Sequence, residues 1–285
     1  MKKVAPGIFV ESSYAPYNLV LITSEVGGIV VDLPPNPVHC LNWLEQARAV
    51  VEPLRYVILT NGSMDRRLAT AACDVPIVAA EGMLRVMQIY DDERRRRDYI
   101  DLLASRFPDE AEAFDYLAPR KPTLALDDAA TLRLGDRVLE LEVVAGAAEG
   151  SLWIWLDEGE LLIAGDTVIA DGVPPMAEVP DSKAWLNTMA GLAHRTNVKT
   201  IVPGRGPASI TRGEIEPQRE VMRVMRRAAR SIAHRGADSL GYARTSQDLG
   251  QTFFNPQGKL AVKEIRAGLE RLVAELAEAE EAEGE

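Results

Sequence analysis

Two stretches of the chain have the same order of elements: short apolar runs come first, and helical segments follow. The apolar runs of the first stretch are 7–10, 19–23, 29–31, 56–59 and 77–79, and those of the second are 123–126, 131–134, 138–144, 152–156, 161–164 and 200–202. Runs this short, bounded by turn residues, are typical of strands. Two such stretches predict an α/β fold of the α+β kind, in which two sheets pack face to face between helices as a four-layer αββα sandwich.

Helices are predicted where apolar residues recur at helical spacing. The predicted segments are 37–51 with Asn36 as N-cap, 66–72, 182–194, 213–235 and 260–282, with a loop between the last two. Region 83–120 is rich in charged helix formers and is predicted to be a helical insertion. Its arginine run, 94–97, is either an anion site or a solvated helix face paired with neighbouring acidic residues. We expect a sandwich domain over 1–210 and a C-terminal helical extension over 211–285, packed on the same domain.

Composition narrows the class of partners. The chain has 32 Lys and Arg against 43 Asp and Glu, a formal charge of −11, which argues against a general binder of nucleic acids or anionic membranes. The sequence has no apolar run near the ~20 residues of a membrane-spanning helix, and Pro6, Gly7 and Glu11 interrupt the apolar stretch that a signal peptide needs. Two cysteines, Cys40 and Cys73, are too few for a disulfide framework. We therefore expect buried or free thiols in a cytoplasmic protein.

Polar or glycine-containing segments follow several predicted strands, where α/β proteins usually carry functional groups. They are Asp32, Thr60-Asn61-Gly62-Ser63-Met64-Asp65-Arg66, Ala145-Gly146-Ala147-Ala148-Glu149-Gly150-Ser151, Gly165-Asp166-Thr167 and Pro203-Gly204-Arg205-Gly206. In order and spacing these segments resemble the motifs of the metallo-β-lactamase superfamily, over roughly residues 4–210. That superfamily has an early strand ending in aspartate, then Thr-His-x-His-x-Asp-His, a later Gly-His, a metal-bridging Gly-Asp and a closing Pro-Gly-His-Gly. The resemblance implies a sandwich of the metallo-β-lactamase type with a hydrolase-like site.

Most metal-ligand positions implied by this resemblance hold other residues. Asn61, Ser63 and Arg66 stand where the superfamily has three histidines, Ala147 and Arg205 stand where it has two more, and Asp65 and Asp166 match its aspartates. The three histidines of the chain, His39, His194 and His234, lie elsewhere. Zinc needs three or four nitrogen, sulfur or acidic oxygen ligands. The resemblance therefore implies the fold without a dinuclear zinc centre, and we expect no metal.

Two aspartates in a cleft without cations need a partner, because burying an unpaired charge is costly. Guanidinium groups bind carboxylates with two parallel hydrogen bonds. We therefore expect Arg66 and Arg205 to occupy the space of the metals and to pair with Asp65 and Asp166. Asp32, which helps to orient the site in the superfamily, either fixes the 60–66 loop or caps its own turn.

Three functions remain open. The first is a non-catalytic binding or scaffolding protein for a protein partner or an anionic small molecule, with ligand-binding candidates Asn61, Arg66, Arg67, Glu149, Arg205 and Asp32. The second is a metal-independent hydrolase with Asp65 or Asp166 as general base and Ser63 nearby. The third is a hydrolase holding Mg²⁺ or Mn²⁺ through Asp65, Asp166 and either Glu149 or Asn61, since oxygen ligands suit these ions.

The C-terminal third suggests a further kind of contact. Arginines 219, 223, 226, 227 and 230 form one basic helix face, whereas the last helix is rich in glutamate from Glu264 to Glu285. We expect these helices to pair within the chain or between subunits, which would make a homodimer. Nucleic-acid binding by the basic helix is the alternative, and the missing metal ligands argue against it.

Overall fold

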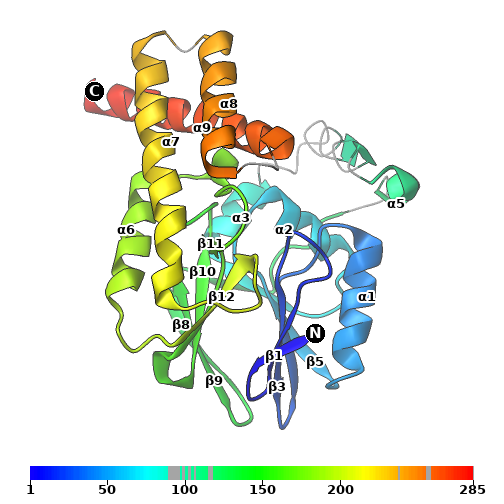
Figure 1. Cartoon of the computed structure of the whole chain (residues 1–285). Coiled ribbons are helices and arrows are strands. Elements are labelled where there is room, and N and C mark those ends of the chain that lie inside the picture. The colour runs from blue at the N-terminus through cyan, green and yellow to red at the C-terminus, as the bar shows by residue number, and fades with distance from the viewer. Residues whose placement is uncertain are drawn as a thin grey trace.

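The strands form two sheets that pack face to face, with helices against both outer faces (Figure 1). This computed structural model describes residues 1–88, 97, 100–101, 104–105, 107–114, 118–236, 238–254 and 258–284. The layers are those of the αββα sandwich that the sequence predicts, so the predicted fold class is confirmed.

The first sheet combines antiparallel and parallel pairing. Its strands, in spatial order, are β1 (Lys2–Ala5), β2 (Ile8–Glu11), β3 (Leu19–Ser24), β4 (Gly27–Val31), β5 (Leu54–Ile58), β6 (Ile77–Ala80) and β7 (Leu124–Leu126). Neighbours from β1 to β4 are antiparallel, whereas those from β4 to β7 are parallel. Parallel neighbours place their carboxyl ends at one edge of the sheet, so the segments after β4 and β5 emerge side by side.

The second sheet is antiparallel except for the parallel pair at one edge. In spatial order it contains β12 (Thr200–Arg205), β11 (Leu161–Ile169), β10 (Leu152–Leu156), β9 (Arg137–Val143) and β8 (Ala129–Leu134). A hairpin joins β10 and β11, with the 3₁₀ turn η4 (Asp157–Gly159) at its tip. Because β11 and β12 are parallel, their carboxyl ends also share an edge.

Helices cover both outer faces. They are α1 (Pro37–Arg48), α2 (Met64–Ala69), α3 (Glu81–Gln88), α5 (Ala111–Phe114), α6 (Ser182–His194), α7 (Glu216–His234), α8 (Ser239–Phe254) and α9 (Gly258–Gly284), with 3₁₀ turns η1 (Thr70–Ala72), η3 (Pro108–Glu110), η5 (Met176–Glu178) and η6 (Arg212–Ile215). The Asn36 side chain accepts hydrogen bonds from the backbone N–H groups of Val38 and His39 at 2.9 and 3.3 Å, which confirms the predicted N-cap.

Alternate side chains along a strand point into two different hydrophobic cores, one between the sheets and one between a sheet and its helices. On β10, the side chains of Leu152, Ile154 and Leu156 pack between the two sheets, while Trp153 and Trp155 face the helices on the outside. This alternation is what the two-residue period of a strand requires when both faces are covered. The strand residues on the two faces are therefore all buried.

The C-terminal helices share the outer core of the second sheet. Ile265 and Leu269 of α9 belong to the same buried cluster as Leu162 of β11 and Met225 of α7. Helices α7 and α8 stand together in Figure 1, and α9 crosses both. These side chains of α7 and α9 are thus buried within the chain itself, whereas Leu240, Phe253 and Leu260 stay exposed.

One predicted element is wrong: the loop expected before the last helix contains α8. Its sequence includes Gly241 and Gly250, which disfavour a helix. The helix is nevertheless formed because Tyr242 and Leu249 pack against the cluster that contains α9. Tertiary packing outweighs local propensity there. Two smaller differences are β1, which the sequence did not predict, and β11, which continues past Ala164 to Ile169.

The predicted insertion over 83–120 is described only in part. Its described elements are α3, η3 and α5, and arginines 94, 95 and 96 lie outside the described residues. Cys40 and Cys73 are buried and free, as predicted. None of the described helices is long and apolar enough to cross a membrane.

Candidate functional site

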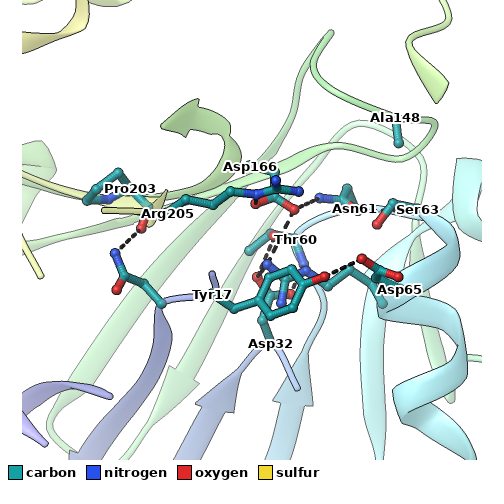
Figure 2. Close-up of polar contacts among 12 residues, drawn as sticks. Tyr17, Asp32, Thr60, Asn61, Ser63, Asp65, Ala148, Asp166, Pro203 and Arg205 are labelled. Carbon is teal, nitrogen blue, oxygen red and sulfur yellow. Dashed lines mark hydrogen bonds and ion pairs between the residues drawn. The ribbon is translucent and has the colours of Figure 1, made fainter. Parts of the chain in front are cut away.

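Strand ends from both sheets meet at one edge of the sandwich and bring the motif residues together (Figure 2). Asp32 follows β4 and Asn61 follows β5, whereas Asp166 lies in β11 and Arg205 ends β12. The pairs β4–β5 and β11–β12 are both parallel, so each pair presents its carboxyl ends together. Residues 100 or more positions apart thus become hydrogen-bond partners.

Asp166 is the centre of this site. Both of its carboxylate oxygens accept N–H donors, and its side chain is only 4% exposed. Oδ2 accepts from Asn61 Nδ2 at 3.3 Å and from Arg66 Nη2 at 3.3 Å. Oδ1 accepts from Arg205 Nε at 3.4 Å. The predicted pairing of Arg66 and Arg205 with Asp166 is therefore confirmed.

Arg66 is completely buried and connects two carboxylates. Its Nη2 lies 3.4 Å from Asp32 Oδ2 in addition to its contact with Asp166, and its Nη1 donates to the carbonyl of Leu33 at 3.4 Å. The guanidinium carbon stands 4.7 Å from the centre of the Tyr17 ring, a cation–π contact. Burial by itself lowers the pKa of Arg66, but Asp32 and Asp166 together raise it above its usual value. The guanidinium therefore remains charged inside the protein.

The two carboxylates that share Arg66 have pKa values shifted in opposite directions. Burial raises the pKa of both. For Asp166 the charges of Arg66 and Arg205 outweigh burial, so its pKa lies below the ordinary value. Asp32 has Arg66 and two hydrogen bonds from Thr60 but also the nearby charge of Asp166, and its pKa stays raised. The number of arginines facing each carboxylate accounts for the difference.

Asp32 holds the loop that begins at Thr60. Its Oδ1 accepts from the Thr60 backbone N–H at 2.9 Å, and its Oδ2 accepts from the Thr60 hydroxyl at 2.6 Å. Its backbone has φ of 60°, in the left-handed region that few non-glycine residues adopt. Of the two roles predicted for Asp32, these contacts favour the one that fixes the 60–66 loop.

Tyr17 is a site residue that sequence reasoning missed. Its hydroxyl donates a short hydrogen bond to Asp65 Oδ2, and its ring also lies 5.6 Å from the Arg205 guanidinium carbon. Burial, with the charge of Asp65 next, raises the pKa of Tyr17, so the phenol is neutral and can donate. The structure thus shows for Asp65 a partner other than the arginines that we expected. The sequence signal was only the turn at 14–16 that precedes this residue.

Asn18, just before β3, holds the closing loop, which is residues 203–207, by hydrogen bonds. Its Nδ2 donates to the carbonyls of Pro203, Gly206 and Pro207 at 2.9, 3.2 and 3.1 Å, and its backbone N–H donates to Gly204 at 2.8 Å. Figure 2 shows Pro203 and Arg205 on the side of Asp166 opposite Asn61 and Ser63. The residue that immediately precedes β3 therefore fixes the position of Arg205.

A second missed residue, Glu178, pairs with Arg67. Arg67 Nη2 lies 3.3 Å from Glu178 Oε2, and Arg67 Nη1 donates to the carbonyl of Val86 at 3.4 Å. The same carboxylate accepts from the backbone N–H of Met64, the first residue of α2, at 3.1 and 3.2 Å. A carboxylate is favoured at the positive end of a helix. Glu178 thereby anchors the helix that carries Arg66 and Arg67.

The remaining candidates lie around this cluster rather than at its centre. The Ser63 backbone N–H donates to Asn61 Oδ1 at 2.9 Å. The Glu149 carbonyl accepts from the Gly62 N–H at 2.7 Å, but its side chain lies towards Gly82 and lines a separate cavity of about 300 Å³. The structure places Glu149 away from the donors of Asp166.

Two glycines explain why the motif segments approach so closely. A Cβ at Gly165 would stand 2.1 Å from Thr60 Oγ1, and one at Gly204 would stand 2.5 Å from Asp166 Oδ1. A side chain at Gly165 would push β11 away from the loop after β5, and one at Gly204 would push β12 away from its neighbour β11. The glycines therefore permit the contact between the loop after β5, β11 and β12 on which the site depends.

These residues do not fit a zinc centre of the kind that the fold implies. A ligand oxygen stands about 2.0–2.2 Å from zinc, yet the oxygens of Asp166 already face two guanidinium groups and an amide. A guanidinium has no lone pair to offer a metal and repels a cation. Among the described residues, no three His, Cys, Asp or Glu side chains are grouped so that they could hold a metal ion. The histidines lie on α1 (His39) and at the ends of α6 (His194) and α7 (His234).

The sandwich of two mixed sheets, with polar residues gathered at the carboxyl ends of β4, β5, β11 and β12, defines a fold class. The chain has the metallo-β-lactamase fold. A metallo-β-lactamase family protein from Thermus thermophilus superposes with a TM-score of 0.66 and 17% identity, over 96% of this chain and 95% of that one.

Other solved structures share the same fold. The DIM-1 metallo-β-lactamase matches with a TM-score of 0.59 and 16% identity, over 78% of this chain and 96% of that one. The sec-alkylsulfatase Pisa1 from Pseudomonas sp. matches with a TM-score of 0.61 and 13% identity, over 94% of this chain and 49% of that one. No protein-family model matches the sequence, and no curated protein matches it. At these identities the likeness establishes the fold alone.

Proposed function

We propose that this metallo-β-lactamase-fold protein uses its site without a metal ion, as a non-catalytic binding or scaffolding protein. The observation that carries the proposal is that both oxygens of Asp166 accept N–H groups from Arg66, Arg205 and Asn61. Two guanidinium groups supply the positive charge that a buried carboxylate requires. The cluster can therefore act as a stable, internally paired support for a binding surface.

The chemistry of the carboxylates supports binding over hydrolysis. A general base works best with a pKa near the working pH, whereas Arg66 and Arg205 hold the pKa of Asp166 below its ordinary value. A serine nucleophile is normally activated by an adjacent base, and Ser63 stands on a loop without histidine. For Mg²⁺ or Mn²⁺, the two arginines beside Asp166 oppose the approach of a cation. These points leave a hydrolase, with or without a hard cation, as the alternative that the experiment below decides.

The formal charge of the groups around Asp166 does not favour the anionic ligand that the sequence predicted. That prediction rested on Arg66, Arg67 and Arg205 outnumbering Asp65 and Asp166. In the structure Asp32 joins Arg66 and Glu178 joins Arg67, at 3.4 and 3.3 Å, so four carboxylates face three arginines. An anion would enter a cluster whose formal balance is negative. We therefore propose binding at this end of the sandwich by groups other than these three arginines.

A homodimer through the C-terminal helices stays a prediction. Its motive was the amphipathic character of these helices, and α9 uses Ile265 and Leu269 within its own chain. The basic face of α7 pairs with glutamates of the same helix: Arg223 with Glu216 at 2.7 Å and Arg227 with Glu220 at 3.3 Å. These apolar and basic side chains already have partners in the same chain, so they do not support binding of a second subunit or a nucleic acid. The mass of the chain in solution, measured by light scattering, tests the dimer.

Elemental analysis tests the proposal directly. The protein is purified without chelator and without an affinity metal, its metal content is measured, and its melting temperature is recorded with and without Zn²⁺, Mn²⁺ or Mg²⁺. We expect far less than one equivalent of any metal and no rise in melting temperature, because arginine N–H groups occupy the oxygens of Asp166. Hydrolysis of ester, phosphodiester and lactam substrates is measured on the same samples and is expected to match the blank.

The opposite outcome is equally definite. One equivalent of metal that is lost in Asp166→Ala, but kept in the matched control Glu140→Ala on the exposed face of β9, would refute the metal-free site. Turnover without metal that disappears in Ser63→Ala would instead establish the metal-independent hydrolase.

A further inference from the structure

A cavity of about 750 Å³ opens beside the Asp166 cluster. Segments far apart in the chain line it: the loop after β2, the loop after β11, the end of β12 and the C-terminal helices α8 and α9. In Figure 1, α8 and α9 lie over the end of the sandwich at which α2 begins. Cavities of roughly 300–1,000 Å³ are the size that holds small molecules. Tyr17 and Arg205 belong both to this cavity and to the buried cluster, so the site and the cavity share a wall.

The charged groups on the cavity wall are mostly acidic. Asp171 and Glu264 line it and are exposed, whereas Arg205 is the cation among the described residues of the wall, with 15% of its side chain exposed. Arg205 already faces Asp166 on its buried side, through its Nε at 3.4 Å. Burial lowers the pKa of Arg205, but Asp166, Tyr17 and Glu264 outweigh burial and raise the pKa above its ordinary value. Glu264 therefore also acts on this guanidinium. Its positive charge is balanced from both sides.

The rest of the wall is largely apolar. Val173 and Ala261 are buried beside the cavity, and Leu260 lines it with 69% of its surface exposed. The polar side chain of Asn18 is occupied by the carbonyls of the closing loop, and Tyr17 donates to Asp65. Among the described lining residues, an occupant therefore meets apolar side chains, Ser12, the exposed edge of Arg205 and two carboxylates.

We infer that this cavity binds a small molecule with an ammonium group on an apolar body, held by Asp171 and Glu264 against the wall of Val173, Leu260 and Ala261. The inference rests on the proposed binding function and supplies its ligand class. A carboxylate or phosphate beside Arg205 would be repelled by Glu264 and Asp166. An ammonium group is attracted by Asp171 and Glu264 on the wall, and the body removes the exposed surface of Leu260 from water.

Two probes that differ only in charge test the inference. Phenethylamine carries an ammonium group at neutral pH, and hydrocinnamate carries a carboxylate on the same phenylethyl body. Binding of each to the full-length protein is measured by calorimetry or ligand-observed NMR at pH 7 and low salt. We expect phenethylamine to bind about two- to five-fold more tightly than hydrocinnamate, as one partly exposed charge contact provides.

Single variants identify the contacts. Glu264→Gln and Asp171→Asn are each expected to weaken phenethylamine binding about three- to five-fold and to leave hydrocinnamate unchanged or tighter. Glu140→Gln, an exposed carboxylate on β9, is the matched control and should change neither. Leu260→Gln should weaken both probes alike, because it removes an apolar contact without changing charge. All four positions are exposed, so the fold tolerates these changes.

The inference is overturned if hydrocinnamate binds as tightly as phenethylamine, or if neither acidic variant weakens the amine. It is also overturned if the amine shows no saturable binding up to about 20 mM, above the Kd expected for a ligand of this size. These results are separate from those on the proposed function, because metal content and turnover are measured without either probe. A metal-free, inactive protein that fails to bind the amine would refute this inference alone.

Discussion

Arginine and carboxylate side chains meet in two contrasting regions of this molecule. In the cluster around Asp166, the Arg66 guanidinium is fully buried and touches Asp32 and Asp166 at 3.4 and 3.3 Å. On α7, Arg223 pairs with Glu216 at 2.7 Å, a shorter contact, yet these side chains are 36% and 53% exposed. Distance alone would rank the helix pair as the stronger interaction.

Solvent reverses that ranking. Water screens the α7 pairs, and a pair of this kind contributes between zero and about 1 kcal/mol. In the buried cluster each charge has lost its hydration, so removing one member leaves the others without compensation. The comparison teaches that the structural importance of an arginine here is set by burial and by the number of carboxylates that depend on it. Variants of both regions test this difference, from the largest expected effect to the smallest.

Arg66→Met should have the largest effect. Methionine fills much of the space but leaves Asp32 and Asp166 as buried carboxylates that have lost their shared partner. We expect a loss of about 3–5 kcal/mol in the free energy of unfolding, measured by urea denaturation at pH 7. Arg66→Lys, which keeps the charge and loses the planar fork, should lie between wild type and Arg66→Met. A loss under about 1 kcal/mol in Arg66→Met would remove the distinction between the two regions.

Asp166→Asn should cost about 2 kcal/mol at pH 7, because hydrogen bonds to a charged acceptor are replaced by weaker ones. The pKa of Asp166 is lower in the folded protein than its ordinary value of 3.8. Its stabilisation is therefore complete above that value and is lost as pH falls through the folded pKa. Urea unfolding at a series of pH values should show the gap between wild type and Asp166→Asn closing only in acid.

Asp32→Asn provides the contrast to that pH series. The folded pKa of Asp32 is raised, so the contribution of its titration falls as pH rises from its ordinary value through the folded pKa. Relative to its own variant, wild type should therefore lose stability with rising pH in that window. Parallel pH profiles for the two variants would contradict the assignment of opposite shifts.

Tyr17→Phe should have an intermediate effect. The change removes the hydroxyl that donates to Asp65 and retains the ring below Arg66 and Arg205. We expect a loss of about 1–2 kcal/mol in the free energy of unfolding, as for a hydrogen bond to a charged group. Tyr14→Phe is the control from the same turn, since its hydroxyl only accepts from the Gln46 side chain at an exposed position. Equal losses in the two variants would show that the Asp65 contact adds nothing.

Arg223→Ala on α7 should have the smallest effect, below about 0.5 kcal/mol at moderate ionic strength. Its charge interacts with Glu216 and Glu220 in water, so even this difference should shrink when NaCl is raised to about 1 M, where the screening length is about 3 Å. Thermal melting at both salt concentrations measures it. A loss as large as that of Tyr17→Phe would mean that the α7 pairs are structural.

The sequence predicted the fold and the centre of the site because both depend on local patterns. Short apolar runs bounded by turn residues located most strands, and Asp32, Asn61, Asp166 and Arg205 stood shortly after them. Helix α8 was missed because its glycines weaken the local signal, and its packing against α9 forms only in the folded chain. Tyr17 and Glu178 were missed because they lie 48 and 114 positions from Asp65 and Met64, the residues that they contact.

The sequence by itself determined which side chains were available: arginine, asparagine, serine and alanine at positions where the resemblance implied histidine, and aspartates at 65 and 166. Only the tertiary structure decided how these groups divide their charges. It gave Asp166 two arginines, joined Asp32 to Arg66, and brought Glu264 of α9 to the cavity beside Arg205. The reason is physical: residue type sets the charge of a group, but burial and the distance between groups set its energy, and both arise only when distant segments pack together.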